Sequence, residues 1–116
     1  MLFLCYPKCT TCQKAKGFLD AWGAAYDFRD IKQENPTAEE LERWWKSSGL
    51  PLKRFFNTSG LQYKALGLKE KLPNMSEQEQ LDLLATDGML VKRPILVGED
   101  FVLVGFRQAE WEETLK

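Results

Sequence analysis

Two cysteines separated by two residues, Cys9 and Cys12, carry the clearest chemical signal in this sequence. They lie where an apolar run ends and an amphipathic segment begins, so we expect Cys9 at the start of a helix. The unpaired N–H groups and the positive end of the helix dipole favour a thiolate there, and the neighbouring Lys8 adds a positive charge. The spacing brings the second sulfur within disulfide reach of the first. The motif therefore predicts an exposed Cys9 thiolate that attacks a substrate first, and a Cys12 thiol that resolves the product.

Two other interpretations of the motif stay open from the residues alone. A cysteine pair can be half of a structural zinc site, but such a site needs four ligands, and the chain has no histidine and only one further cysteine, Cys5. The pair could also be small core residues, because free cysteine is often buried. Cys5 lies inside the apolar run and is interpreted as a core residue, with a role as a backup resolving thiol as the alternative. No metal site is expected.

Composition limits the classes to which the chain can belong. Its 116 residues, of which 44% are hydrophobic, suit a single domain over residues 1–116. Sixteen lysines and arginines against 17 aspartates and glutamates leave a net charge of −1, so there is no basic footprint for direct nucleic-acid binding. No apolar run approaches the roughly 20 residues that span a bilayer. Three cysteines crowded near the N-terminus are unlike a secreted disulfide framework, and we expect a cytoplasmic protein with no membrane partner.

The elements expected around Cys9 form a β-α-β unit. Residues 1–6 suit a buried strand, residues 10–22 an amphipathic helix that Gly23 ends, and Tyr26 and Phe28 alternate with charged residues as in a second strand. The apolar face of the helix consists of Ala15, Phe18, Leu19 and Trp22. A unit of this length predicts that the first two strands are parallel.

A helical insert, at about residues 31–91, should follow this unit. Capping boxes begin two of its helices, at Thr37 with Glu40 and at Ser76 with Glu79. We expect Gly49 and Gly88 to end these two helices. Residues 51–68 suit two short helical turns that are broken by a cluster of turn-forming residues.

The last part of the chain should complete the sheet. Residues 95–97 and 101–104 flank a three-residue hairpin turn, and residues 108–116 form a final helix. The predicted fold is therefore α/β, with a mixed four-stranded sheet and the helical insert between its second and third strands.

Basic residues stand at both ends of this hairpin. Lys92 and Arg93 precede Pro94, which suits the first position of a strand, and Arg107 follows the fourth strand. From the residues alone, each basic residue could serve an anion or a thiolate as readily as it could be a solvated charge at the sheet edge.

Together these segments resemble the arsenate-reductase-like (ArsC/Spx/YffB) family, a branch of the thioredoxin-like fold. The likeness is carried by the segments YPKCTTCQKAKGFLD, VKRPILV and LVGFRQAEWEETL, and it extends from Leu2 to about Leu115. The resemblance implies that Cys9 is the catalytic nucleophile, and that Arg93 and Arg107 hold an oxyanion and lower the pKa of the thiol. It also implies that Pro94 is the cis-proline beside the active thiol.

Lys8, Thr10 and Thr11 flank Cys9 and are expected at the substrate as well. Asn57 stands near the position where arsenate reductases of the family carry a third arginine. A charge-assisted contact of that kind is worth about 1.5–3 kcal/mol, so we expect weak arsenate turnover.

Cys12 stands where glutaredoxin-coupled arsenate reductases have a residue without a thiol, and it predicts an internal disulfide with Cys9. We therefore expect a thiol-dependent oxidoreductase that acts on a small thiol or oxyanion. It should need no bound cofactor, with glutathione, a glutaredoxin or a thioredoxin as the reductant. The Spx regulators share the two-cysteine motif and provide the alternative function, a redox-sensing transcriptional regulator that binds the α subunit of RNA polymerase.

Overall fold

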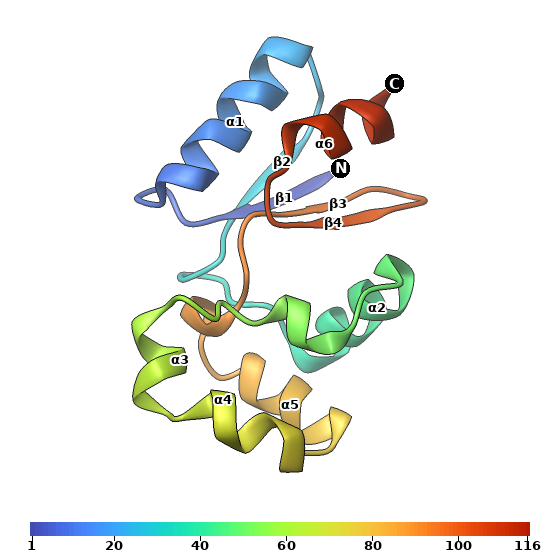
Figure 1. Ribbon diagram of the computed structural model, residues 1–116. Helices are drawn as coiled ribbons and strands as arrows, with labels where there is room; N and C mark the ends of the chain where they lie inside the picture. The colour runs from blue at the N-terminus through green and yellow to red at the C-terminus, as the bar shows by residue number, and fades with distance from the viewer.

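A four-stranded sheet forms the centre of the computed structural model, which describes residues 1–116 (Figure 1). Its strands are β1 (Leu2–Cys5), β2 (Asp27–Asp30), β3 (Ile95–Val97) and β4 (Val102–Val104), in the order β2-β1-β3-β4. Strands β1 and β2 are parallel, whereas β3 is antiparallel to both β1 and β4. The mixed sheet and its parallel first pair confirm the predicted thioredoxin-like arrangement.

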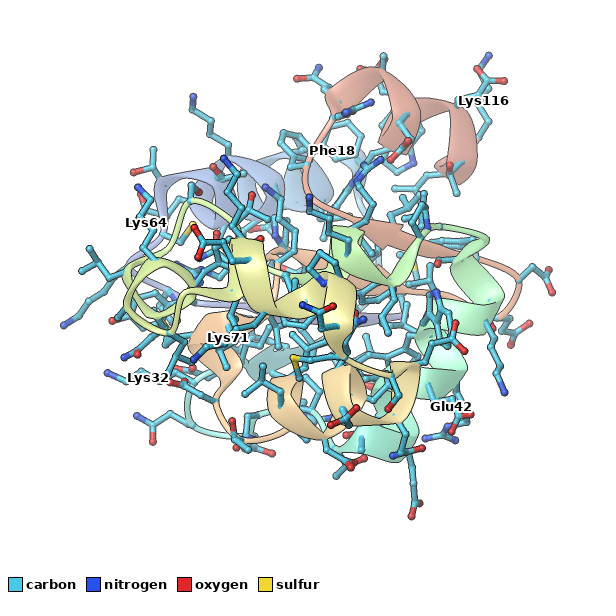
Figure 2. The ribbon with its side chains drawn as sticks, turned by 60° about the horizontal axis from the view of Figure 1, so that its bottom comes forward. Phe18, Lys32, Glu42, Lys64, Lys71 and Lys116 are labelled. Atoms are coloured by element: carbon cyan, nitrogen blue, oxygen red, sulfur yellow. The ribbon has the colours of Figure 1, made fainter.

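Two helices, α1 (Thr10–Trp22) and α6 (Gln108–Leu115), cover one face of the sheet (Figure 1). Phe18 of α1 lies between them, with its ring 5.7 Å from that of Phe106 and 6.3 Å from that of Trp111 (Figure 2). Gly23 ends α1 in the left-handed conformation, as predicted. Trp22 was predicted to face the core and does not, because it packs against Phe18 at the end of the helix and stays 42% exposed.

The insert covers the other face of the sheet with short helices (Figure 1). They are α2 (Ala38–Ser48), α3 (Leu61–Ala65), α4 (Leu68–Lys71) and α5 (Glu77–Leu84), with 3₁₀ turns at Leu52–Phe55, Leu72–Asn74 and Gly88–Leu90. Both predicted capping boxes are present, at the starts of α2 and α5. Charged side chains such as Glu42 and Lys64 lie at the periphery (Figure 2). None of the helices is long and apolar enough to cross a membrane.

A β bridge fixes the insert beside the start of β3. It pairs Phe56 with Val91, and the Lys92 amide donates a hydrogen bond to the Phe55 carbonyl at 2.8 Å. The sequence pattern did not predict this bridge. It holds the 3₁₀ turn at Leu52–Phe55 next to the segment that carries Arg93.

The prediction that Gly88 ends a helix of the insert was wrong. Helix α5 ends four residues earlier, at Leu84, and Gly88 instead begins the 3₁₀ turn before β3. Gly88 is buried, and a Cβ atom there would overlap the carbonyl oxygen of Ile31. A glycine is required here by the close approach of two backbone segments rather than by a helix end.

An ion pair between Arg29 and Glu40 joins β2 to α2. Arg29 Nη1 and Nη2 donate to the Glu40 carboxylate at 2.7 and 2.9 Å, and the Thr37 amide donates to it at 3.0 Å. The hydrogen bonds from Arg29 are the main cause that lowers the pKa of Glu40 to about 2, against its usual value of 4.5.

We expect Glu40 to make the stability of the fold sensitive to acid. A carboxyl group with a lowered pKa in the folded state contributes stability above its unfolded pKa, near 4.5, and this contribution is lost as the pH falls through about 2. Urea unfolding of the wild type should therefore show a free energy of unfolding that decreases more steeply below about pH 4.5 than in Glu40→Gln. Glu39→Gln changes an exposed residue of the same helical turn and is the matched control. Equal pH dependence of the wild type and Glu40→Gln would contradict this prediction.

Candidate active site

Cys9 is the N-cap residue of α1, at the predicted junction between a strand and a helix. Its backbone is extended, its amide donates to the Tyr6 carbonyl at 2.9 Å, and no side chain caps the helix. The first N–H groups of α1 therefore lie beside the Cys9 side chain without a side-chain acceptor, and a negative charge is stabilised at this place. Cys9 is the one partly exposed cysteine of the three.

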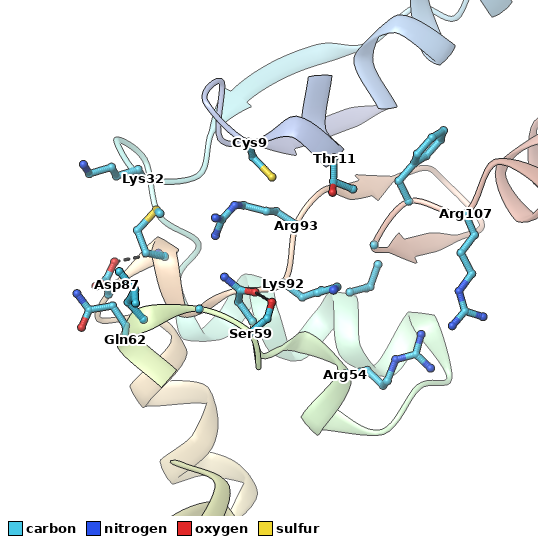
Figure 3. Close-up of a pocket in the computed structure, with 17 residues that line it drawn as sticks. Cys9, Thr11, Lys32, Arg54, Ser59, Gln62, Asp87, Lys92, Arg93 and Arg107 are labelled. Carbon is cyan, nitrogen blue, oxygen red and sulfur yellow. Dashed lines mark hydrogen bonds between the residues drawn. The ribbon is translucent and has the colours of Figure 1, made fainter. Parts of the chain in front are cut away.

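Cys9 lines a cleft of about 850 Å³ whose walls come from the start of α1, the insert and the ends of β3 and β4 (Figure 3). Five of the 17 lining residues are cationic, and one, Asp87, is anionic. The cationic residues are Lys32, Arg54, Lys92, Arg93 and Arg107. This excess of positive charge favours an anionic ligand, although the whole chain has a net charge of −1.

Arg93 lies on the Cys9 side of this cleft (Figure 3). Its guanidinium carbon is 5.5 Å from the centre of the Tyr6 ring, and its Nε and Nη1 atoms are buried without a hydrogen-bond partner. A buried donor without an acceptor costs about 1–3 kcal/mol, and more when it is charged. An anion bound beside Cys9 would supply the acceptors that these two nitrogen atoms lack.

The predicted neighbours of Cys9 divide into two groups. Thr11 lines the cleft together with Cys9, whereas Lys8 and Thr10 are exposed but do not line it. Successive residues at a helix start point about 100° apart, so a run of neighbours cannot all face one cleft. Pro94 is buried outside the lining, its carbonyl accepts the Gly105 amide at 2.8 Å, and its bond to Arg93 is cis, as the resemblance implied.

Arg107 and Asn57 also line the cleft. Figure 3 shows the Arg107 side chain directed away from Cys9, toward the end of the cleft where Arg54 lies. Arg54 was not predicted at the site from its place in the sequence. It lies three residues before Asn57, so the insert does carry an arginine into the cleft near the position where the resemblance predicted its loss.

Cys12 is buried and hydrogen-bonded to its neighbours. Hydrogen bonding from Cys5 is the main cause that lowers the pKa of Cys12 to about 7, and the Tyr6 amide, which donates to Cys12 Sγ at 3.3 Å, contributes to the same effect. Hydrogen bonding from Cys9 and the positive charge of Arg93 lower the pKa of Cys12 further. A resolving thiol benefits from such a pKa, because the thiolate is the attacking form. No group of three or more cysteine, aspartate or glutamate side chains is arranged to hold a metal ion.

Comparison with known proteins places this geometry in a family. The uncharacterised protein YusI of Bacillus subtilis is 50% identical over 113 residues, which are 97% of this chain and 96% of YusI. The regulatory protein MgsR of the same organism is 31% identical over 110 residues, or 95% of this chain and 86% of MgsR. The crystal structure of a possible arsenate reductase from Streptococcus mutans is 49% identical and has a TM-score of 0.89, with 97% of this chain and 96% of that chain covered.

The profile of the ArsC family matches residues 4–114, which include Cys9, Cys12, Arg93 and Arg107. Its match extends over nearly the whole chain, from the second half of β1 through the insert to the penultimate residue of α6. The chain therefore belongs to the ArsC family.

Proposed function

We propose that the protein is a thiol-dependent oxidoreductase that reduces an anionic disulfide, or a similarly oxidised anionic thiol compound, in the cationic cleft. The observation that carries this proposal is the position of Cys9. Its sulfur lies at the N-terminus of α1, in the same cleft as the unpaired, buried donors of Arg93. A nucleophile and an anion-binding group are thus present in one cleft.

In this mechanism the Cys9 thiolate attacks one sulfur of the substrate disulfide. A mixed disulfide forms on Cys9, and the other half of the substrate leaves as a thiolate. Cys12 then attacks Cys9 Sγ, releases the second half, and leaves a Cys9–Cys12 disulfide. Two electrons have passed from the protein to the substrate, and glutathione, a glutaredoxin or a thioredoxin restores the two thiols.

The size of the cleft bears on the class of substrate. Its volume of about 850 Å³ is in the range that holds a small organic ligand, and it exceeds by far the space that a tetrahedral oxyanion fills. Arg93 is near Cys9, whereas Arg54 and Arg107 lie toward the other end (Figure 3). This distribution favours an extended thiol compound with more than one anionic group over arsenate alone.

Two disulfides of opposite charge test the proposal. With dithiothreitol as the reductant, we expect kcat/KM for anionic glutathione disulfide to exceed that for cationic cystamine by about tenfold or more at low ionic strength, and the ratio to fall as salt is added. In Arg93→Met the ratio should fall by about tenfold or more, since each lost charge-assisted hydrogen bond is worth about 1.5–3 kcal/mol.

Arg43→Met removes an exposed arginine of α2 outside the cleft and should leave this ratio unchanged. If the wild type reduced both disulfides equally well and Arg93→Met left the ratio of kcat/KM values unchanged, the proposal that the cleft binds the anionic substrate would be overturned. The absence of any turnover would overturn the enzymatic function.

The 31% identity with the regulatory protein MgsR favours a second candidate function, that of a regulator. Following the resemblance to the Spx regulators, we propose that such a regulator would sense redox state and bind RNA polymerase. In that function the Cys9–Cys12 disulfide is the signal rather than an intermediate. Immobilised oxidised protein would retain the purified polymerase α subunit, and Cys12→Ser would lose the response to oxidation. Retention without disulfide turnover would favour the regulator over the reductase.

A further inference from the structure

Cys5 has no part in the mechanism above, yet it lies against Cys12. Cys5 ends β1 and Cys12 belongs to the first turn of α1, with 3% and 1% of their surfaces exposed. The Tyr6 backbone links the two side chains, because its amide donates to Cys12 Sγ at 3.3 Å and its carbonyl accepts from Cys5 Sγ at 3.9 Å. Cys5 and Cys12 also belong to one buried cluster, and the partly exposed Cys9 packs against that cluster. Cys9 begins the helical turn that contains Cys12, so Cys12 has one thiol neighbour at the start of its own helix and another in β1.

The two thiol neighbours of Cys12 face different cavities. Cys9 lines the cationic cleft. Cys5 and Cys12 line a second, smaller hollow of about 180 Å³. The other residues of this hollow are Pro7, Gln13, Lys16 and Phe28, and none of them lines the cleft. Cys12 thus stands between the nucleophile in the cleft and a buried thiol at the hollow.

We propose that Cys5 is a second resolving thiol, which takes over the disulfide from Cys9 and returns Cys9 to its reduced form. The inference rests on the proposed function, because that function forms the Cys9–Cys12 disulfide. Cys5 Sγ attacks Cys12 Sγ, the Cys5–Cys12 bond forms, and the Cys9–Cys12 bond breaks with its electron pair left on Cys9 Sγ. The proton of Cys5 passes to Cys9, so the exchange needs no oxidant or reductant from outside.

The surroundings of Cys5 impose an order on these steps. In the reduced protein, the hydrogen bond to Cys12, burial and the negative charge of Cys12 raise the pKa of Cys5 above its usual range, and Cys5 stays protonated. A Cys12 sulfur in a disulfide carries no charge, so the hydrogen bond to its thiolate and the charge repulsion both disappear. Burial still raises the pKa of Cys5, but the two causes that come from Cys12 are gone, so Cys5 ionises more readily after Cys12 has been oxidised than before.

One consequence of the exchange can be measured. After the disulfide has moved to Cys5 and Cys12, the free Cys9 reacts with a second substrate molecule and retains half of it, because no resolving thiol is left. Without Cys5, oxidation stops at the Cys9–Cys12 disulfide. The two end states differ in mass by the retained half of the substrate.

Tryptic mapping distinguishes the two disulfides, because trypsin cleaves after Lys8 and Lys14. Cys9 and Cys12 fall in one peptide, residues 9–14, and Cys5 falls in residues 1–8. The reduced wild type is treated with excess glutathione disulfide, quenched with acid, alkylated and digested. We expect the two peptides to be joined by a Cys5–Cys12 disulfide, with one glutathionyl group on Cys9. Cys5→Ala should instead show a disulfide within residues 9–14 and no glutathionyl group.

The possible failures are separable. A wild type that holds the Cys9–Cys12 disulfide with Cys5 as a free thiol would overturn this inference and leave the proposed function standing. A Cys9 that does not react with glutathione disulfide at all would overturn both. The decisive measurement uses the wild type, so it does not depend on how well Cys5→Ala folds.

Discussion

Cys9→Ser is expected to lower kcat/KM for glutathione disulfide by a factor of roughly 10³ or more, because a serine hydroxyl does not ionise near neutral pH and cannot form the mixed disulfide. Serine is also a preferred N-cap residue, so the helix start should keep its stability. Turnover with dithiothreitol and thermal unfolding, measured on the same preparation, separate the loss of the nucleophile from a loss of the fold.

Cys12→Ser is the matched variant for this measurement. It keeps the nucleophile and removes the resolving thiol, so one glutathionyl group should accumulate on Cys9 when glutathione disulfide is added without a reductant. If Cys9→Ser retained more than about a tenth of the wild-type kcat/KM, Cys9 would not be the nucleophile.

Gly88→Ala is expected to lower the free energy of unfolding by about 3 kcal/mol or more. This is a large effect for a substitution that adds one methyl group. The new Cβ atom would overlap the Ile31 carbonyl oxygen, a backbone atom that cannot move without displacing the segment that follows β2. Urea unfolding gives the difference directly, because a chain of this size usually unfolds in one cooperative transition.

Gly17→Ala provides the control for this substitution. Gly17 is exposed in the interior of α1, and nothing lies within 4 Å of a Cβ atom built there. It should therefore stabilise the protein by about 0.5–1 kcal/mol, the usual difference between glycine and alanine in a helix. If Gly88→Ala unfolded within about 1 kcal/mol of the wild type, the close approach to Ile31 would not be a real constraint.

The parts of the fold that could be predicted are those that local residues determine. The capping boxes at Thr37 and Ser76 and the left-handed glycines at Gly23 and Gly49 act through neighbours in the chain, and all four end or begin helices where expected. Gly88 is also a glycine, but the need for a glycine there comes from the close approach of the Ile31 backbone, which is distant in sequence. No local pattern separates a glycine at a helix end from a glycine at a backbone crossing.

The candidate site divides in the same way. Cys9, Cys12 and Arg93 stand in short motifs, and the structure brings Cys9 and Arg93 to one cleft. Arg54 reaches that cleft because the insert folds back and pairs Phe56 with Val91, and Lys32 reaches it from the segment that follows β2. Their contribution to the positive charge was therefore invisible in a sequence whose charges nearly balance.

The place of β3 in the sheet also has a consequence for synthesis on the ribosome. β3 is the inner neighbour of β1, yet the whole insert separates the two strands in the chain. A nascent chain thus carries β1 with an open edge, and its three N-terminal thiols without Arg93, until translation has passed β3. During that time nothing buries Cys5 and Cys12 against the completed sheet. Cys5 and Cys12 are therefore accessible to oxidants until the last two strands emerge, so oxidative stress should affect the newly made chain more than the folded protein.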